Sequence, residues 1–328
     1  MRGSGRSDRI ASCAGVLLTL MLTLPPAHAE DYPTRPVHIV VPFPPGGTAD
    51  ALPRLIGDWL ARKWGQSVII ENKAGAAGNI GAEAVANAEP DGYTLLSSPP
   101  PPLVVNQNLY PKLGFDPAAF VPITVTAIVP TALVVNPVRV TANTVPEFIA
   151  LARASPGKIT SATQGNGTTS HLTSEMFQML AKVQFVHVPY RGSAPALQGL
   201  VAGDVDIMFD NLGVSLALVQ GGQLKLIAVG TERRMSTLPS IPTIAETLPG
   251  FVSSAWFAVV APPKTPQGIV HAINAGVTEA LRQPEIVKRL ADLSAEPVGS
   301  SPTEALKFMN EETDRWRAVI KNVGIKLE

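Results

Sequence analysis

Short apolar runs alternate along this chain with longer segments in which apolar residues recur every three or four positions. The run from Val37 to Val41 has the length and composition of a buried strand. The next apolar residues recur at i, i+3, i+4, i+7 and i+8, the spacing of an amphipathic helix. They are Leu52, Leu55, Ile56, Trp59 and Leu60. The pattern therefore predicts a strand, a loop and a helix, in that order.

The same alternation continues to the end of the chain. Further strands are predicted at Val68–Ile70, Tyr93–Leu96, Ile123–Val129, Leu133–Val135, Ile159–Ala162, Phe185–Val188, Val205–Phe209, Leu224–Val229 and Trp256–Val260. Further helices are predicted around Leu172–Leu180, Leu197–Val201 and Phe308–Ile320. Strands that alternate with helices favour an α/β fold with parallel sheets covered on both faces. The run Pro99–Pro102 is expected to form a rigid loop.

The loop between the first strand and the first helix, from Pro42 to Asp50, is the most informative segment. It reads Pro-Phe-Pro-Pro-Gly-Gly-Thr-Ala-Asp. Gly46 and Gly47 let the backbone approach a ligand without a Cβ in the way. The free N–H groups of the helix start would then face an anion. Because the loop holds no Lys, Arg, His or Cys, it favours backbone recognition of a carboxylate over catalysis.

A second strand, loop and helix of this kind follows Lys158. The loop reads Gln-Gly-Asn-Gly-Thr-Thr-Ser-His from Gln164 to His171, and an amphipathic helix begins near Leu172. Its hydroxyl side chains can cap the helix or reach a ligand. Open α/β sheets bind ligands at the carboxyl ends of their strands, where both loops would lie. Two such loops facing each other would clamp a small carboxylate.

Residues 1–29 have the pattern of a secretory signal peptide. Three arginines precede residue 10, the apolar stretch Ala14–Leu24 is too short to span a bilayer, and Ala27-His28-Ala29 is a small-residue cleavage signal. We therefore expect cleavage after Ala29 and export to the periplasm. The single cysteine, Cys13, precedes the apolar stretch, so the mature chain would have no thiol for a disulfide, nucleophile or metal.

The charge balance excludes a nucleic-acid-binding surface. The chain has 26 basic and 26 acidic residues, and the leader takes three arginines and one aspartate with it. The mature chain would carry a small negative charge and no basic field for nucleic acid or anionic lipid. Its remaining length suits one large core or two domains.

Ordered motifs along nearly the whole mature chain resemble those of the Bug-type periplasmic solute-binding proteins of tripartite tricarboxylate transporters. Besides the Pro42–Asp50 and Gly165–His171 loops, they are Tyr32–Pro36, Glu71–Gly81, Pro90–Leu96, Val188–Gly192 and Leu238–Glu246. The resemblance implies a two-lobed, Venus-flytrap fold of the type II-like periplasmic-binding-protein class, with two crossovers and a ligand cleft between the lobes. We expect the first lobe to comprise residues 30–130 and 251–328, and the second 131–250. The crossovers are expected near Thr126 to Thr131 and Gly250 to Ala255.

The resemblance also implies a function. A monomeric receptor would capture a small carboxylate, close around it, and deliver it to the membrane permease subunits of a tripartite transporter, without any cofactor or metal. In the first lobe the implied ligand-binding residues are Pro44, Pro45, Gly46, Gly47 and Thr48. In the second lobe they are Thr163, Asn166, Thr168, Thr169, Ser170, Tyr190, Arg191 and Gly192. Two further candidates are Ser98, after the strand Tyr93–Leu96, and Asp210, which ends the strand Val205–Phe209 at the carboxyl edge.

Several roles stay open at this level. Asp50 and Asp210 fit either contact with a ligand amine or a structural cap, and Arg191 fits either a ligand carboxylate or solvent. A receptor that presents its ligand to a sensor kinase would use the same cleft. A secreted hydrolase built on Ser170, His171 and Asp210 is a third reading. The spacing of the mature histidines does not predict a metal site.

Overall fold

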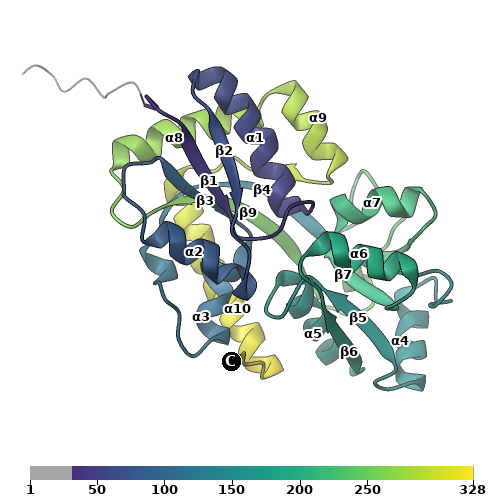
Figure 1. Ribbon diagram of the computed structural model, residues 1–328. Coiled ribbons are helices and arrows are strands. Elements are labelled where there is room, and N and C mark those ends of the chain that lie inside the picture. Colours follow the sequence, from purple (N-terminus) through teal and green to yellow (C-terminus); the bar gives the residue numbers. More distant parts are fainter. Residues whose placement is uncertain (1–31, 328) are drawn as a thin grey trace, which may run out of the picture.

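The computed structural model describes residues 32–327, apart from the side chain of Val323. The expected signal peptide, its cleavage site and Cys13 lie outside these residues. Figure 1 shows two layered units side by side, which we call the first and second lobes. Within the described residues, no helix combines the length and apolar character that crossing a bilayer requires.

The first lobe is built on a sheet with strand order β2-β1-β3-β9-β4, with β10 paired to β4. Its strands are β1 (Val37–Val41), β2 (Val68–Asn72), β3 (Thr94–Ser98), β9 (Ser254–Ala261), β10 (Glu296–Pro297) and the first part of β4 (Val121–Val135). Its helices are α1 (Thr48–Trp64), α2 (Asn79–Ala86), α3 (Asn106–Leu109), α8 (Gln267–Leu281), α9 (Pro284–Asp292) and α10 (Pro302–Val323). Short helical turns are η1 (Ala76–Gly78), η2 (Pro101–Val105) and η3 (Pro117–Ala119).

The second lobe is built on a smaller sheet in which the last part of β4 lies between β7 and β8. Beyond β7 come β5 and then β6. Its own strands are β5 (Ile159–Thr163), β6 (Phe185–Pro189), β7 (Ile207–Asn211) and β8 (Lys225–Val229). Its helices are α4 (Val145–Ala154), α5 (Thr169–Ala181), α6 (Ser193–Ala202), α7 (Leu212–Gln220) and the short turn η4 (Ile244–Glu246).

Strand β4 joins the two lobes, and here the sequence-based expectation of two strands was wrong. The residues from Val121 to Pro130 pair with β9, and those from Thr131 to Val135 pair with β7 and β8. Pro130 has no N–H for a ladder and sits where the partner strand changes, so it does not interrupt the strand. The predicted crossovers stay predictions about where the lobes divide.

Two further expectations needed correction. The sheets are mixed: β1, β2 and β3 are parallel, as are β5, β6 and β7, but β4 and β9 run antiparallel to their neighbours. The proline run does not stay a loop, because η2 begins at Pro101 and continues into α3. Prolines are tolerated in the first turn of a helix, where their missing N–H would have no partner in any case.

Apolar clusters fill both faces of each sheet. In the first lobe, the predicted stripe of α1 is buried against β1, with Leu52 and Leu60 each 1% exposed. The opposite face packs α2, η2 and α10, including the fully buried Trp316. In the second lobe, α4 and α5 cover one face and α6 and α7 the other. The amphipathic pattern of the sequence therefore predicted the buried face of α1 correctly.

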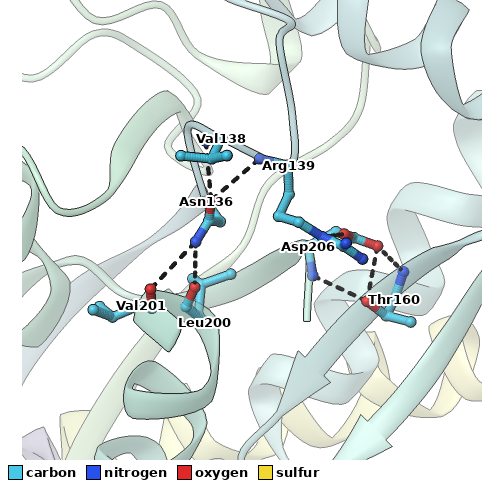
Figure 2. A network of polar contacts seen from close by, with 7 residues as sticks. All are labelled: Asn136, Val138, Arg139, Thr160, Leu200, Val201 and Asp206. Carbon is cyan, nitrogen blue, oxygen red and sulfur yellow. Dashed lines mark hydrogen bonds and ion pairs between the residues drawn. The ribbon is translucent and has the colours of Figure 1, made fainter. Parts of the chain in front are cut away.

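A polar network holds one end of the second lobe's sheet, where β4 ends and β5 and β7 begin (Figure 2). Asp206, 7% exposed, accepts hydrogen bonds from Arg139 Nε and from the backbone N–H and hydroxyl of Thr160, each at 2.8 Å. Asn136 Nδ2 donates to the carbonyl of Leu200 at the end of α6. The network ties β4, β5, β7 and α6 into one frame, which holds their opposite ends in register.

Candidate functional site: four helix starts around one cleft

Four helices begin at the same small cavity, of about 30 Å³, where the two lobes meet. The residues that cap or open α1, α5, α6 and α7 all line it. They are Gly47, Thr48, Thr168, Thr169, Gly192, Ser193 and Asn211. Among the described residues, no side chain caps any of these four starts. Four helix starts, with their first N–H groups and positive dipole ends, therefore border one cavity.

This arrangement suits a carboxylate. A helix N-terminus binds anions through its free N–H groups and its dipole, and here four act together. Thr48 Oγ1 is buried and has no hydrogen-bond partner within residues 32–327. A buried hydroxyl in that state is a position for a ligand or an ordered water. The small cavity can hold one such group.

A larger cavity of about 550 Å³ adjoins the small one and shares Phe43, Pro44, Gln164, Thr168 and Gly192 with it. Its remaining lining is mainly apolar or small. It comprises Pro42, Ala74, Gly75, Ala76, Ala77, Gly78, Tyr110, Gly165, Asn166, Tyr190 and Arg191. Arg191 is exposed and is the only charged residue among these described lining residues. The larger cavity thus offers space for the apolar part of a ligand, with the Arg191 cation among its lining residues.

The structure places many of the expected site residues along this cleft. The expected residues that line one cavity or both are Pro44, Gly47, Thr48, Asn166, Thr168, Thr169, Tyr190, Arg191 and Gly192. The others do not line either cavity: Pro45, Gly46, Ser98, Thr163, Ser170 and Asp210. No ligand contact tests their roles, so the assignment of the whole set stays a prediction.

Some of the residues behind the lining hold the two loops in shape. The Gly46 N–H donates to Asp50 Oδ2 at 3.2 Å, with Gly46 at φ +92°, which favours glycine. Thr163 Oγ1 accepts from the Gly165 N–H at 3.3 Å. Ser98 Oγ donates to the Pro99 carbonyl. These side chains act on the backbone next to the cavities.

Asp50 serves the first loop. Its Oδ1 accepts from Arg54 Nε and Asn72 Nδ2, both at 2.9 Å. Burial opposes ionisation, but the hydrogen bonds from Arg54, Asn72 and Gly46 outweigh it and lower the pKa of Asp50. The carboxylate is therefore ionised and occupied by the protein's own donors, as expected for a structural role.

His171 holds the second loop. Its Nδ1 accepts from the Gly167 N–H at 3.1 Å, so the neutral ring carries its proton on Nε2. That Nε2 lies 3.6 Å from Glu175 Oε1. Burial lowers the pKa of His171 to about 4, and His187 adds to the effect while Glu175 opposes it. The neutral ring keeps the loop closed on itself at neutral pH.

The spacing of the histidines in the sequence did not predict a metal site, but the fold brings His171, Glu175 and His187 together. One ligand atom from each lies within 4.8 Å of the others. His187 Nε2 is 2.9 Å from Glu175 Oε1. A metal-bound histidine usually donates from its second nitrogen, whereas Nδ1 of His171 faces the N–H donor of Gly167. Because the proton of the neutral His171 ring lies on Nε2, the nitrogen that faces Glu175, the ring has no lone pair there for a metal.

Ser170, His171 and Asp210 do not form the catalytic triad of the hydrolase alternative. His171 bonds to Gly167, while Asp210 accepts from Gln164 and Ser193. Ser170 Oγ is buried without a partner among residues 32–327. A catalytic triad requires a hydrogen-bonded chain through the histidine, which this geometry does not provide.

Sequence reasoning missed several lining residues. The loop from Ala74 to Gly78 follows β2 just as the two expected loops follow their strands, so its glycines were a usable signal. Gln164, Ser193 and Asn211 each adjoin a residue that was expected in the site. Phe43 lies inside the first loop. Tyr110 had no sequence signal, because only the tertiary structure brings it to the cleft.

Solved structures with the same fold include two that contain a carboxylate. "R. palustris Rpa4515 with adipate" is 39% identical, with a TM-score of 0.87, over 90% of this chain and 99% of that one. MatC from Rhodopseudomonas palustris with bound malate is 34% identical, with a TM-score of 0.82, over 88% and 100%. The periplasmic binding protein BugD is 30% identical, with a TM-score of 0.85, over 90% and 100%. These matches confirm the two-lobed solute-binding fold.

Sequence relatives agree with this fold. Protein BugT of Bordetella pertussis is 35% identical over 323 residues, covering 98% of this chain and 99% of its own. A UPF0065 protein from the tcbD-tcbE intergenic region of Pseudomonas sp. is 37% identical over 311 residues, covering 94% and 92%. Residues 52–325 match the model of the tripartite tricarboxylate transporter family receptor. The chain therefore belongs to the family of tripartite tricarboxylate transporter receptors, as its motifs indicated.

Proposed function

We propose that this chain is a periplasmic receptor that captures a small carboxylate between its lobes and delivers it to the permease subunits of a tripartite tricarboxylate transporter. The convergence of four uncapped helix starts on one cavity carries the proposal. Backbone N–H groups and helix dipoles recognise a carboxylate without reacting with it. We therefore propose binding and release, not catalysis.

The two cavities suggest the shape of the ligand. One carboxylate would occupy the helix-start cavity, and the rest would extend over the apolar surface of Phe43, Ala76 and Tyr110 in the larger cavity. A second carboxylate would then reach Arg191 at its edge. Because guanidinium groups pair with carboxylates through two N–H donors, this favours a dicarboxylate with an apolar chain.

Delivery requires that ligand binding favour the closed arrangement of the lobes. A ligand shifts that equilibrium only by its better fit to the closed state. Here the four helix starts come from both lobes, so only the closed arrangement presents all of them to one anion. The receptor would thus signal its loaded state to the permease through its shape.

A thermal-shift screen tests the proposal. The mature chain, residues 30–328, is unfolded and refolded to remove carried-over ligand, then melted with adipate, malate and uncharged diamide or diester analogues. At a hundredfold excess over Kd, a bound ligand adds about 2.7 kcal/mol to the free energy of unfolding. We expect a shift of about 5 °C or more for at least one carboxylate and none for its uncharged analogue. Equal shifts for both would refute carboxylate recognition.

Delivery of the ligand to the permease is tested separately. Loaded receptor is titrated onto proteoliposomes that contain the tripartite permease, and uptake of labelled ligand is followed. Uptake that needs the receptor supports the transport role. A receptor that binds ligand tightly but never stimulates uptake would instead favour presentation to a sensor.

A further inference from the structure

Asp210 is a buried carboxyl one hydrogen bond away from the helix-start cavity. It is 0% exposed, and its Oδ1 accepts from Gln164 Nε2 at 2.8 Å and from Ser193 Oγ at 2.9 Å. Both donors line the cavity. Its other oxygen, Oδ2, has no hydrogen-bond partner within residues 32–327. The ligand-binding role proposed above makes no use of this second oxygen.

No counter-charge compensates Asp210. Strand β7, which carries it, packs against β4, β5, α5, α6 and α7. In these described elements the titratable residues are His171 and Glu175, both on α5. His171 bonds to the Gly167 N–H, and Glu175 pairs with His187. No cation of the described chain lies within ion-pair distance of the Asp210 carboxyl.

An anion arriving in the cavity therefore changes the environment of Asp210 directly. It brings a like charge next to a buried carboxylate, and a like charge favours the protonated form. It also occupies the positive ends of α6 and α7, which otherwise help to stabilise the Asp210 charge. Both effects act in the same direction.

We propose that carboxylate capture by this chain is coupled to the uptake of a proton at Asp210, an inference that rests on the carboxylate site proposed above. The proton would go to Oδ2, because Oδ1 already accepts two hydrogen bonds. Burial raises the pKa of Asp210 to about 6, while Gln164, Ser193, the Asn211 backbone N–H and Ser215 oppose the rise. The group is thus poised to gain a proton near neutral pH when a second negative charge arrives.

The proposal also selects among ligands. A dicarboxylate offers Asp210 only like charge and should bind with proton uptake. An acidic amino acid also carries an ammonium group, and its positive charge in the cavity would favour the ionised form of the nearby Asp210 carboxyl. The sign of proton exchange therefore separates the two ligand classes at the same site.

Isothermal titration calorimetry tests the coupling. Adipate is titrated into the refolded mature chain at pH 6.5 in Mes and in imidazole, at equal ionic strength. The difference in heat between the buffers gives the number of protons exchanged. We expect an uptake of about 0.3–0.5 proton per adipate, the change for a shift of about half to one pH unit near the midpoint of Asp210. The adipate Kd should also rise about 1.5- to threefold from pH 6.5 to 8, a range in which adipate itself stays a dianion.

Two variants locate the proton. In Asp210→Asn the titrating group is removed, so uptake should fall to near zero and the Kd should lose its pH dependence. Asp204→Asn, an exposed aspartate just before β7, is the matched control and should keep the uptake. If Asp210→Asn does not melt cooperatively, the buffer-dependent heat and the pH dependence of the adipate Kd of the unaltered chain decide whether binding takes up a proton.

The outcomes are distinct. Adipate that binds with no buffer-dependent heat, or with proton release, overturns the coupling and leaves the receptor function standing. Uptake that persists in folded Asp210→Asn also overturns it. If no carboxylate binds at any pH, the proposed function fails and the coupling fails with it.

Discussion

Replacing Gly47 with valine should weaken ligand binding without unfolding the protein. Gly47 precedes α1 in the first lobe, with φ −99°, a backbone conformation that any residue adopts. A Cβ built there would lie 3.4 Å from the Cβ of Ser193, at the start of α6 in the second lobe. Alanine should therefore fit in ordinary van der Waals contact. Valine adds two methyl groups beyond that Cβ, in a space of about 30 Å³.

The expected magnitude follows from this contact. Overfilling a packed site costs about 1–3 kcal/mol. Gly47 and Ser193 belong to different lobes, so the cost falls on the closed state that binds ligand. At about 1.4 kcal/mol per tenfold change in Kd, the affinity should fall about 5- to 150-fold. The melting temperature of the ligand-free protein should change little.

Calorimetric titration with adipate, beside Gly47→Ala and the unaltered chain, measures this effect. The alanine variant should bind within about threefold of the unaltered protein, since one contact at the edge of the normal range costs under about 1 kcal/mol. If Gly47→Val bound with an unchanged Kd, the helix-start cavity would not be where the ligand sits. A large loss for both variants would show that even a Cβ obstructs the anion.

The remaining predictions concern the cation, the frame and pH. Arg191→Gln should weaken adipate binding by up to about fivefold, as for an exposed ion pair, and leave hexanoate unaffected in parallel titrations; an equal loss for both would remove Arg191 from the site. Asp206→Ala should lower the free energy of unfolding by about 1–3 kcal/mol in urea, because it leaves the partly buried Thr160 N–H without its acceptor, and the adipate Kd should stay the same. A changed Kd would mean that the frame in Figure 2 also sets the cleft geometry. For pH, the native state holds His171 neutral with a pKa of about 4, below its unfolded value, so this residue's stabilisation is lost as pH falls from about 6.5 to 4. Asp210, with a raised pKa of about 6, has the opposite effect and destabilises the native state as pH rises from about 4 to 6. Relative to the unaltered chain, His171→Gln should therefore gain melting temperature at acid pH and Asp210→Asn at neutral pH; parallel curves for all three proteins would contradict both assignments.

Much of the local structure was readable from the sequence. The apolar stripe from Leu52 to Leu60 predicted α1 because a helix brings positions three and four apart onto one face. The loops that begin at Pro42 and Gln164 were expected to face an anion, because glycines before a helix leave its N–H groups free. Both loops line the cleft. Strand ends were less accurate, since pairing partners, not the segment itself, decide where a strand stops.

The length of β4 shows why. Its sequence contains Pro130, which looks like a break in isolation. The strand continues because β9 supplies the partners on one side of Pro130 and β7 and β8 supply them on the other. Nothing within the segment itself encodes that change of partner. For the same reason the sequence could not show that β4 and β9 would run antiparallel to the strands beside them.

By itself, the sequence determined the local chemistry of this protein: glycine-rich loops at helix starts, amphipathic helices, and ordered motifs of the receptor family. Only the tertiary structure decided that the starts of α6 and α7 join those of α1 and α5, and that Asp210 lies uncompensated behind them. A helix start depends on a few neighbouring residues, so it leaves a local signal. The convergence of four starts, and the burial that sets the protonation of Asp210, depend on residues far apart in the chain that only folding brings together.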